Sequence, residues 1–150
     1  MTDDANVFMV AAIERARAAD VAGEVPVGAV VVRNGVVLAA AGNRVETDND
    51  PSAHAEILAI REACRTEGAP RLPDCDLYVT LEPCAMCAQA IANARIRRLY
   101  FGAYDPKGGG VEHGATVFRQ PTCHHAPEVY GGIAEREAGD LLKAFFTSRR

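Results

Sequence analysis

The sequence predicts a single α/β domain over residues 1–150, in which helices cover both faces of a mixed β-sheet. Two apolar runs, residues 27–32 and 36–41, flank an Asn34-Gly35 pair, and this arrangement is typical of a β-hairpin. Helical and strand patterns then alternate along the chain, which favours parallel strands joined by helical crossovers. Because both runs are apolar nearly throughout, we expect them to be covered on both faces.

A packing helix precedes the hairpin. Asp3 and Asp4 suit its start, because carboxylates interact favourably with the amide groups of a helix N-terminus. Phe8 and several alanines then recur at helical spacing as far as about Asp20. The stretch Gly23-Glu24-Val25-Pro26 ends this helix and turns the chain into the first strand.

Helices and strands alternate after the hairpin. Asp50-Pro51-Ser52 is a helix-start signal, and the helix that follows contains His54 and should pack through Ile57, Leu58 and Ile60. A strand at 77–80, a helix near Cys84 and a strand at 99–102 come next. A loop, a short helix, a weak edge strand and a last helix are expected at 105–110, 115–119, 129–130 and 133–146. In such sheets, ligands bind at the carboxyl ends of the strands.

Composition limits the classes of function. About half of the residues are apolar, so the chain can form a core, and the net charge of −4 counts against a large non-specific nucleic-acid surface. The start of the chain lacks a signal-peptide pattern, and no apolar run is long enough to span a membrane. Five cysteines are an odd number, which favours a reducing cytoplasm. Cys64, Cys75 and Cys123 have no partner spacing, and we expect them to be small buried residues.

Two short stretches, His54-Ala55-Glu56 and Pro83 to Cys87, combine the side chains of a catalytic zinc site. His54, Cys84 and Cys87 offer one imidazole and two thiols, which leave the fourth tetrahedral position of zinc open for water. Glu56 is then a free carboxylate beside that water, able to move its protons. We therefore predict a zinc centre with these three ligands and Glu56 as proton shuttle.

Each part of this pattern is ambiguous alone. Cys84 and Cys87 could be a redox pair or half of a structural zinc site, and His54 could be an ordinary histidine. Together they are more specific, because both stretches fall at helix starts, where thiols have lowered pKa values. The combination H-x-E…P-C-x-x-C is also the signature of zinc-dependent nucleobase deaminases.

Longer stretches resemble the bacterial tRNA-specific adenosine deaminases, a branch of the zinc-dependent cytidine and deoxycytidylate deaminase superfamily. The resemblance runs from Glu24 to Arg150 and implies a single zinc-dependent deaminase domain, with a three-layer cytidine-deaminase-like fold and a five-stranded mixed sheet between helices. The matching stretches are Glu24–Ala29, Gly42–Arg44, Asp50-Pro51, His54–Ile57, Tyr78–Cys87, Phe101–Ala103 with Asp105, and Phe145-Phe146.

The resemblance also implies an activity and a set of substrate contacts. The family deaminates the wobble adenosine of a tRNA anticodon hydrolytically to inosine with a zinc-activated water. Its members act as homodimers with one Zn²⁺ per subunit. Asn43 matches a residue that hydrogen-bonds the purine, Ala55 one whose backbone lines the pocket, and Asp105 one that contacts the preceding nucleotide. The residues that match the helix holding the anticodon stem-loop are Phe145, Phe146, Arg149 and Arg150. From the residues alone, Asn43 and Asp105 would be turn residues and the phenylalanines core.

Other functions stay open at this point. The chain departs from the family at Tyr104, Glu112 and His113, and the acidic net charge favours a small substrate, so a zinc-dependent deaminase of free guanine, cytosine or deoxycytidylate is the main alternative. A non-catalytic tRNA-binding zinc subunit would not need Glu56. A redox Cys-x-x-Cys protein would need neither zinc nor His54.

Overall fold

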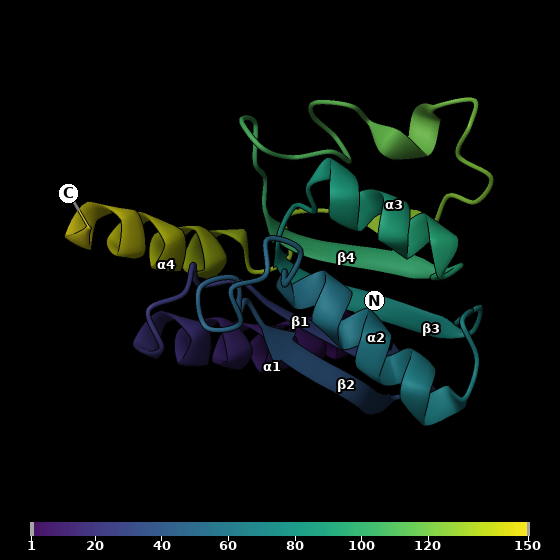
Figure 1. Ribbon diagram of the computed structural model, residues 1–150, viewed down its shortest axis with the longest axis horizontal. Helices are drawn as coiled ribbons and strands as arrows, with labels where there is room; N and C mark the ends of the chain where they lie inside the picture. The colour runs from purple at the N-terminus through teal and green to yellow at the C-terminus, as the bar shows by residue number, and fades with distance from the viewer. Residues whose placement is uncertain (1, 150) are drawn as a thin grey trace.

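The computed structural model describes residues 2–149 and contains a five-stranded mixed sheet between helices (Figure 1), as predicted. The strands are β1 (Gly28–Arg33), β2 (Val36–Gly42), β3 (Cys75–Leu81), β4 (Arg98–Ala103) and β5 (Glu128–Tyr130). The helices are α1 (Thr2–Val21), α2 (Ala55–Glu67), α3 (Ala85–Asn93), the short 3₁₀ helix η1 (Val117–Arg119) and α4 (Glu135–Ser148). The predicted elements are all present, with their ends shifted by a few residues.

The predicted hairpin joins β1 to β2. Asn34 and Gly35 both have positive φ, 50° and 75°, as a two-residue hairpin turn of the primed type requires. The prediction that the second strand is covered on both faces is wrong at its start, where Val36 is 60% exposed and Val37 is 42% exposed. These residues lie on the edge strand beside the turn, where one side of the sheet has no neighbouring strand.

The second half of the sheet is parallel, as predicted. The strand order is β2-β1-β3-β4-β5; β1 pairs with β3 antiparallel, whereas β3, β4 and β5 run parallel. The carboxyl ends of β3 and β4 therefore lie at the same edge of the sheet. The segments that leave these two ends, Glu82-Pro83 and Tyr104-Asp105, are thereby brought together.

Helices cover both faces of the sheet. Met9 and Ile13 of α1 pack against one face, and α2 and α3 pack against the other, while α4 extends past the sheet (Figure 1). On α2, the prediction of Ile57, Leu58 and Ile60 as packing residues is right only for Ile60, since the other two are half-buried. The buried face is formed mainly by alanines, whose small side chains let the helix lie close to the sheet: Ala55, Ala59 and Ala63.

The cysteines outside the metal motif differ in burial. Cys75 is buried, whereas Cys64 and Cys123 are half-buried and pack against the core, so the prediction of burial is right only for Cys75. All five are free thiols. Among the described helices, none is both long enough and apolar enough to cross a membrane.

Candidate metal centre and active site

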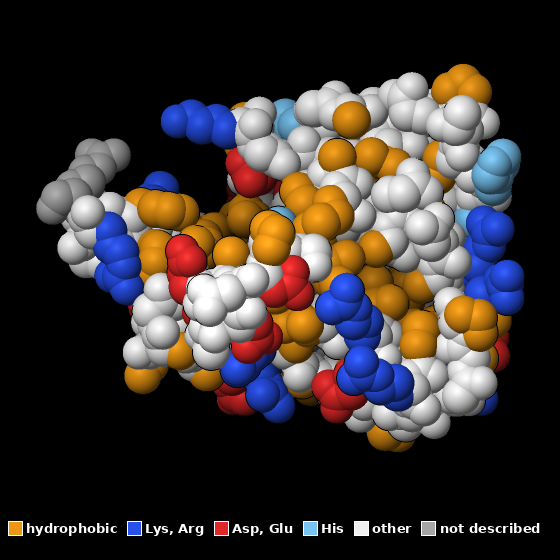
Figure 2. All heavy atoms as spheres, viewed as in Figure 1, with side chains coloured by type: hydrophobic (Ala, Val, Ile, Leu, Met, Phe, Trp, Pro, Cys, Tyr) orange, Lys and Arg blue, Asp and Glu red, His pale blue; other side chains and the backbone are white. Residues whose placement is uncertain are grey.

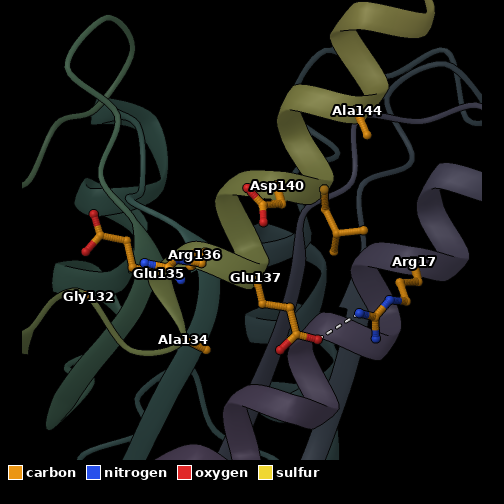
Figure 3. A pocket seen from close by; sticks show the side chains of 9 residues that line it. Arg17, Gly132, Ala134, Glu135, Arg136, Glu137, Asp140 and Ala144 are labelled. Carbon is orange, nitrogen blue, oxygen red and sulfur yellow. Dashed lines mark hydrogen bonds and ion pairs between the residues drawn. The ribbon is translucent and has the colours of Figure 1, made fainter.

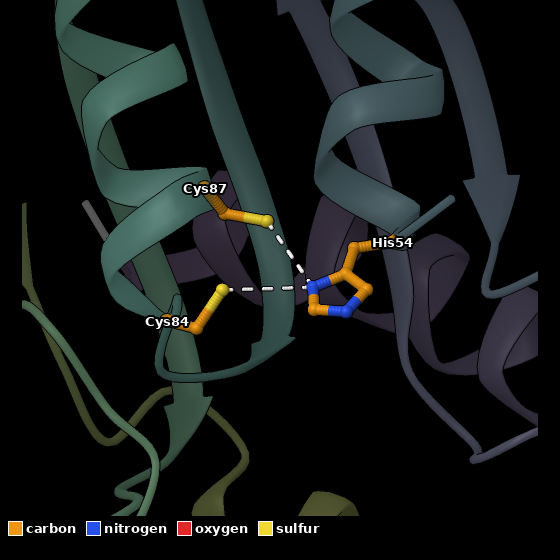
Figure 4. A group of neighbouring side chains, drawn as sticks. All are labelled: His54, Cys84 and Cys87. Atoms are coloured by element: carbon orange, nitrogen blue, oxygen red, sulfur yellow. Dashed lines mark hydrogen bonds between the residues drawn. The ribbon is translucent and has the colours of Figure 1, made fainter. Parts of the chain in front are cut away.

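The metal motif is assembled from the starts of two helices. His54 is the N-cap residue of α2 and Cys84 that of α3, and both have extended backbone angles, with ψ of 151° and 174°. Neither side chain caps its helix, so both project past the helix ends. Cys87 lies in the first turn of α3 and points to the same place (Figure 4). Asp50 does not start α2, because its Oδ1 accepts hydrogen bonds from Ser52 in a turn that precedes the helix.

The three predicted ligands converge. His54 Nδ1 lies 3.6 Å from Cys84 Sγ and 3.4 Å from Cys87 Sγ, and the three ligand atoms lie within 4.8 Å of one another. Zinc bonds of ordinary length at tetrahedral angles would put nitrogen and sulfur ligands about 3.5 Å apart. The donor set and its spacing therefore fit zinc with one coordination position left over.

The electrostatics of the cluster favour a metal cation. Hydrogen bonds from Cys87 and from His54 lower the pKa of Cys84 to about 4, so this thiol is ionised at neutral pH. The hydrogen bond to Cys84 raises the pKa of His54, because the imidazolium form is stabilised beside a thiolate. Cysteine binds zinc as the thiolate, and a helix N-terminus favours this ionised form.

Glu56 lies beside the ligands on the first turn of α2. The residue is buried, with 4% of its surface exposed, and burial raises the pKa of its carboxyl group to about 7. A hydrogen bond with Cys87 partly offsets the effect of burial on this pKa. The structure therefore places a carboxyl group next to the metal cluster, where the sequence predicts the proton shuttle.

The cluster opens into a large cavity of about 1200 Å³. Figure 2 shows hydrophobic side chains gathered between α4, on the left, and the rest of the molecule. His54, Glu56 and Cys84 line this cavity, whereas Cys87 is buried behind them. The predicted substrate contacts that also line it are Asn43, Asp105, Phe145, Phe146 and Arg149.

Asn43 and Asp105 each have a structural partner as well as a place in the cavity wall. Asn43 Oδ1 accepts a hydrogen bond from the Ala55 amide at 2.8 Å, which fixes the start of α2. Asp105 Oδ1 accepts hydrogen bonds from the amides of Lys107 and Gly108, at 3.3 and 2.9 Å. The turn roles that the residue types alone suggested are therefore present, and both side chains are held rigidly at the cavity.

The C-terminal phenylalanines divide between core and surface. Phe145 is 6% exposed, and the Arg149 guanidinium lies 4.0 Å from the centre of its ring. Phe146 is 51% exposed and lines the cavity. Phe145 thus combines a buried position with a place in the cavity wall, and Phe146 fits the substrate-contact prediction. Arg150 lies outside the described residues.

Two buried carboxylates that shape the cavity were not predicted from the sequence. Glu24 accepts hydrogen bonds from the Glu46 amide and from the amide and hydroxyl of Thr47, at 3.2, 2.7 and 2.6 Å. Glu82 accepts backbone hydrogen bonds from the loop after β4. Both belong to stretches quoted for the resemblance, and the signal in each is an acidic residue beside an apolar strand.

A second cavity, of about 760 Å³, lies between α1 and α4 (Figure 3). Arg17 and Glu137 form an ion pair of 2.7 Å across it, and Glu135, Arg136 and Asp140 add two negative charges and one positive charge. Among the described residues, the one group with metal-ligand geometry is the His54 cluster, which is not part of this cavity. The chemistry therefore belongs to the larger cavity.

Comparison with known proteins agrees with the geometry. Residues 2–103 match the family described as cytidine and deoxycytidylate deaminase zinc-binding region. A tRNA-specific adenosine deaminase of Agrobacterium fabrum is 59% identical over 95% of this chain and 94% of its own length. A solved structure from a study of A-to-I editing by tRNA:A34 deaminases at the wobble position is 60% identical, has a TM-score of 0.90 and covers 91% of this chain and 99% of its own. A guanine deaminase of Bacillus subtilis is 33% identical, with a TM-score of 0.66, over 99% of this chain and 94% of its own.

The metal centre predicts how zinc content responds to substitution. His54→Ala and Cys84→Ala should each lower zinc affinity more than about 100-fold, because two ligands cannot hold the ion against a chelator. Metal analysis after dialysis against a chelator measures this. Cys64→Ala removes a half-buried thiol elsewhere on α2 and should keep full zinc content. Full zinc content in His54→Ala would contradict this assignment of the ligand.

The Glu24 carboxylate predicts a pH-dependent contribution to stability. Burial raises its pKa, but the hydrogen bonds from Thr47 and Glu46 outweigh burial and leave the pKa below the ordinary value of 4.5. A lowered pKa stabilises the fold above the unfolded-state pKa, and the benefit is lost as the pH falls through the folded-state pKa. The stability difference between wild type and Glu24→Gln should therefore shrink between about pH 7 and about pH 3.

Urea unfolding at both pH values measures this difference. Glu46→Gln alters an exposed carboxylate of the same loop, and its stability should stay within about 0.5 kcal/mol of wild type. A difference for Glu24→Gln that is constant with pH would show that the carboxylate charge does not hold this loop.

Proposed function

Because the chain belongs to the zinc-binding cytidine and deoxycytidylate deaminases, and among them to the tRNA-specific adenosine deaminases, we propose that it hydrolyses adenosine to inosine at the wobble position of a tRNA anticodon. One observation carries the proposal: the buried Glu56 carboxyl lies beside the His54, Cys84 and Cys87 cluster at the wall of an open cavity. A cluster that served only to stabilise the fold would not need this carboxyl.

The three ligands and Glu56 have separate roles. His54, Cys84 and Cys87 would hold a zinc ion, which when bound supplies the chemistry that lowers the pKa of the attacking water to about 7. Glu56 takes a proton from this water and delivers it to the ring nitrogen beside the amino-bearing carbon of adenine. The water oxygen bonds to that carbon, Glu56 takes the remaining proton of this oxygen and passes it to the amino group, and ammonia leaves as the carbon–oxygen double bond of inosine forms. The overall balance is adenosine plus water to inosine plus ammonia.

The residues around the cluster orient the base. Asn43 is held by the Ala55 amide through Oδ1, so its Nδ2 is the group that can donate to a purine nitrogen. His54 and Glu56, on either side of Ala55, line the same cavity as the Asp105 turn. A base held between fixed walls is positioned for attack before reaction, which lowers the entropic cost of the step.

The size of the cavity supports a nucleic-acid substrate over a free base. At about 1200 Å³, it exceeds the roughly 300–1,000 Å³ that is typical of pockets for drug-sized ligands. Exposed Phe146 offers a surface on which an unstacked base can lie, and Lys107 and Arg149 can contact phosphates. An anticodon loop presents its bases unpaired, so extruding one is less costly than from a duplex.

We further propose that the protein acts in the cytoplasm as a homodimer with one zinc ion per subunit. The dimer is what the resemblance implies, and the free state of the five cysteines fits a reducing compartment. The outer faces of α2 and α3 are candidates for the contact, because Met86 on α3 is 39% exposed and a cavity of about 310 Å³ lies between the two helices.

The proposed function predicts inosine formation in a tRNA-Arg anticodon stem-loop by the zinc-loaded protein. Glu56→Gln keeps the size of the side chain but cannot carry the proton, so it should retain zinc and lose about 10²- to 10⁴-fold in turnover. Glu62→Gln alters an exposed carboxylate on the same helix and should keep wild-type turnover. Turnover of Glu56→Gln within tenfold of wild type would refute the proton-shuttle role.

Free guanine, cytidine, deoxycytidylate and adenosine complete the experiment. We expect no conversion of these at concentrations where the stem-loop is fully converted. If the folded, zinc-loaded protein leaves the stem-loop unchanged and converts one of the small molecules, the deaminase site stands and the tRNA substrate is wrong. If it converts none, the proposed function is wrong.

A further inference from the structure

The Glu82 carboxylate joins two segments of the site. One is the turn of residues 82–84, here called the metal-ligand turn, and the other is a loop that lines the cavity. Its side chain is fully buried, with 0% exposed, directly after β3 and two residues before Cys84. Residues 105–113, here called the clamp loop, surround it with hydrogen-bond donors. Oε1 accepts from the amide of Asp105 (3.0 Å) and from His113 Nδ1 (2.8 Å), and Oε2 accepts from the amides of Val111 (3.2 Å), Glu112 (2.9 Å) and His113 (3.1 Å).

A buried carboxylate with this set of partners determines where the loop lies. Removing a carboxylate from water is costly unless hydrogen bonds replace those of the solvent. Here four of the five donors are backbone amides of one loop, so the loop must keep its position for the charge to stay satisfied. Hydrogen bonds to a charged group are about twice as strong as neutral ones.

The clamp loop is also seated closely on the metal-ligand turn. The Gly110 amide donates to the Pro83 carbonyl at 2.8 Å. A Cβ atom at Gly109 would collide with the Glu82 carboxylate, and one at Gly110 would lie 2.6 Å from the Ala85 nitrogen. Larger residues would therefore push the loop away from the start of α3.

The other side of the clamp loop faces the cavity. Asp105, Lys107 and Gly108 line it, and the Asp105 side chain is held by the amides of the other two. One buried side chain thus links the position of the turn before Cys84 to the position of loop residues that line the same cavity as Asn43 and His54.

We propose that Glu82 is a positioning residue for substrate recognition, which holds the clamp loop at a set distance from the metal ligands so that Asp105 and Lys107 meet the RNA beside the reacting base. This inference rests on the proposed function. It assigns Glu82 no contact with the reacting atoms. Loss of the clamp should therefore weaken binding of the stem-loop more than it slows the chemical step.

Glu82→Gln tests the proposal with a change of one atom. The amide replaces one acceptor oxygen by an NH₂ group. This group cannot accept hydrogen bonds from the loop amides, because both are donors. KM for the anticodon stem-loop should rise at least about tenfold, while kcat stays within about threefold and zinc content is unchanged. Glu112→Gln is the matched control, because Arg119, at 3.4 Å, is the one hydrogen-bond partner of this exposed carboxylate among the described residues. Its KM should equal that of wild type.

Gly109→Ala disrupts the contact between Glu82 and the clamp loop by a change in the loop, and it should give the same rise in KM. If Glu82→Gln does not fold, Gly109→Ala provides the test. A wild-type KM in either folded variant overturns the proposal. So does a parallel fall of kcat and zinc content, because this would mark Glu82 as a structural support of the metal centre.

Hydrogen exchange separates this inference from the proposed function. In Glu82→Gln the amides of Val111, Glu112 and His113 should exchange at least about tenfold faster, while those of α3 stay protected. If the wild-type protein is inactive on the stem-loop, the proposed function is wrong, and the exchange data alone then test whether Glu82 holds the clamp loop in place. Unchanged protection of the three amides would overturn it.

Discussion

The site depends on one constraint, the meeting of two helix N-termini at one edge of the sheet. His54 and Cys84 are both N-cap residues with extended backbones, so their side chains leave the helix ends and do not lie along the helix faces. The parallel pairing of β3 with β4 brings the loop after β4 to the same edge. Three ligand atoms within 4.8 Å then follow from where the helices begin. The amide groups at both helix starts favour the thiolate that zinc requires.

Two buried carboxylates extend this arrangement to the cavity walls. Glu24 holds the Glu46-Thr47 segment, and Glu82 holds the segment after β4. Loops that carry substrate contacts are normally the most mobile parts of a domain. Here the cost of leaving a buried charge unsatisfied keeps these segments in place. The walls are thereby fixed before substrate binds, which reduces the ordering that binding would otherwise require.

Much of the fold and of the metal cluster could be predicted because the evidence is local. Hairpin residues and the spacing of Cys84 and Cys87 report on their own backbone, whereas the helix-start signal at Asp50 belongs to the turn before α2. Burial depends on neighbours far along the chain, so the exposure of Val36 and the half-burial of Ile57 could not be seen. The role of Glu82 depends on amides more than twenty residues away, and no pattern within its own segment indicates them. The resemblance added Asn43 and Asp105, for which the residue types alone suggested only turns.

An acidic protein can still present a surface that suits RNA, because its acidic and basic side chains can differ in how far they are exposed to solvent. Of the five acidic residues that line the cavity, Glu24, Glu56 and Glu82 are each less than 5% exposed, whereas Asp105 is half-buried and Glu46 is exposed. The carboxylates of Glu24 and Glu82 are buried and accept hydrogen bonds from donors of the protein. Their repulsion of a phosphate at the rim of the cavity is therefore weak. The cations of the same cavity, Lys107, Lys143 and Arg149, are exposed. The net charge of −4 therefore counts residues that a bound strand does not meet, whereas phosphate contacts depend on the cations at the rim.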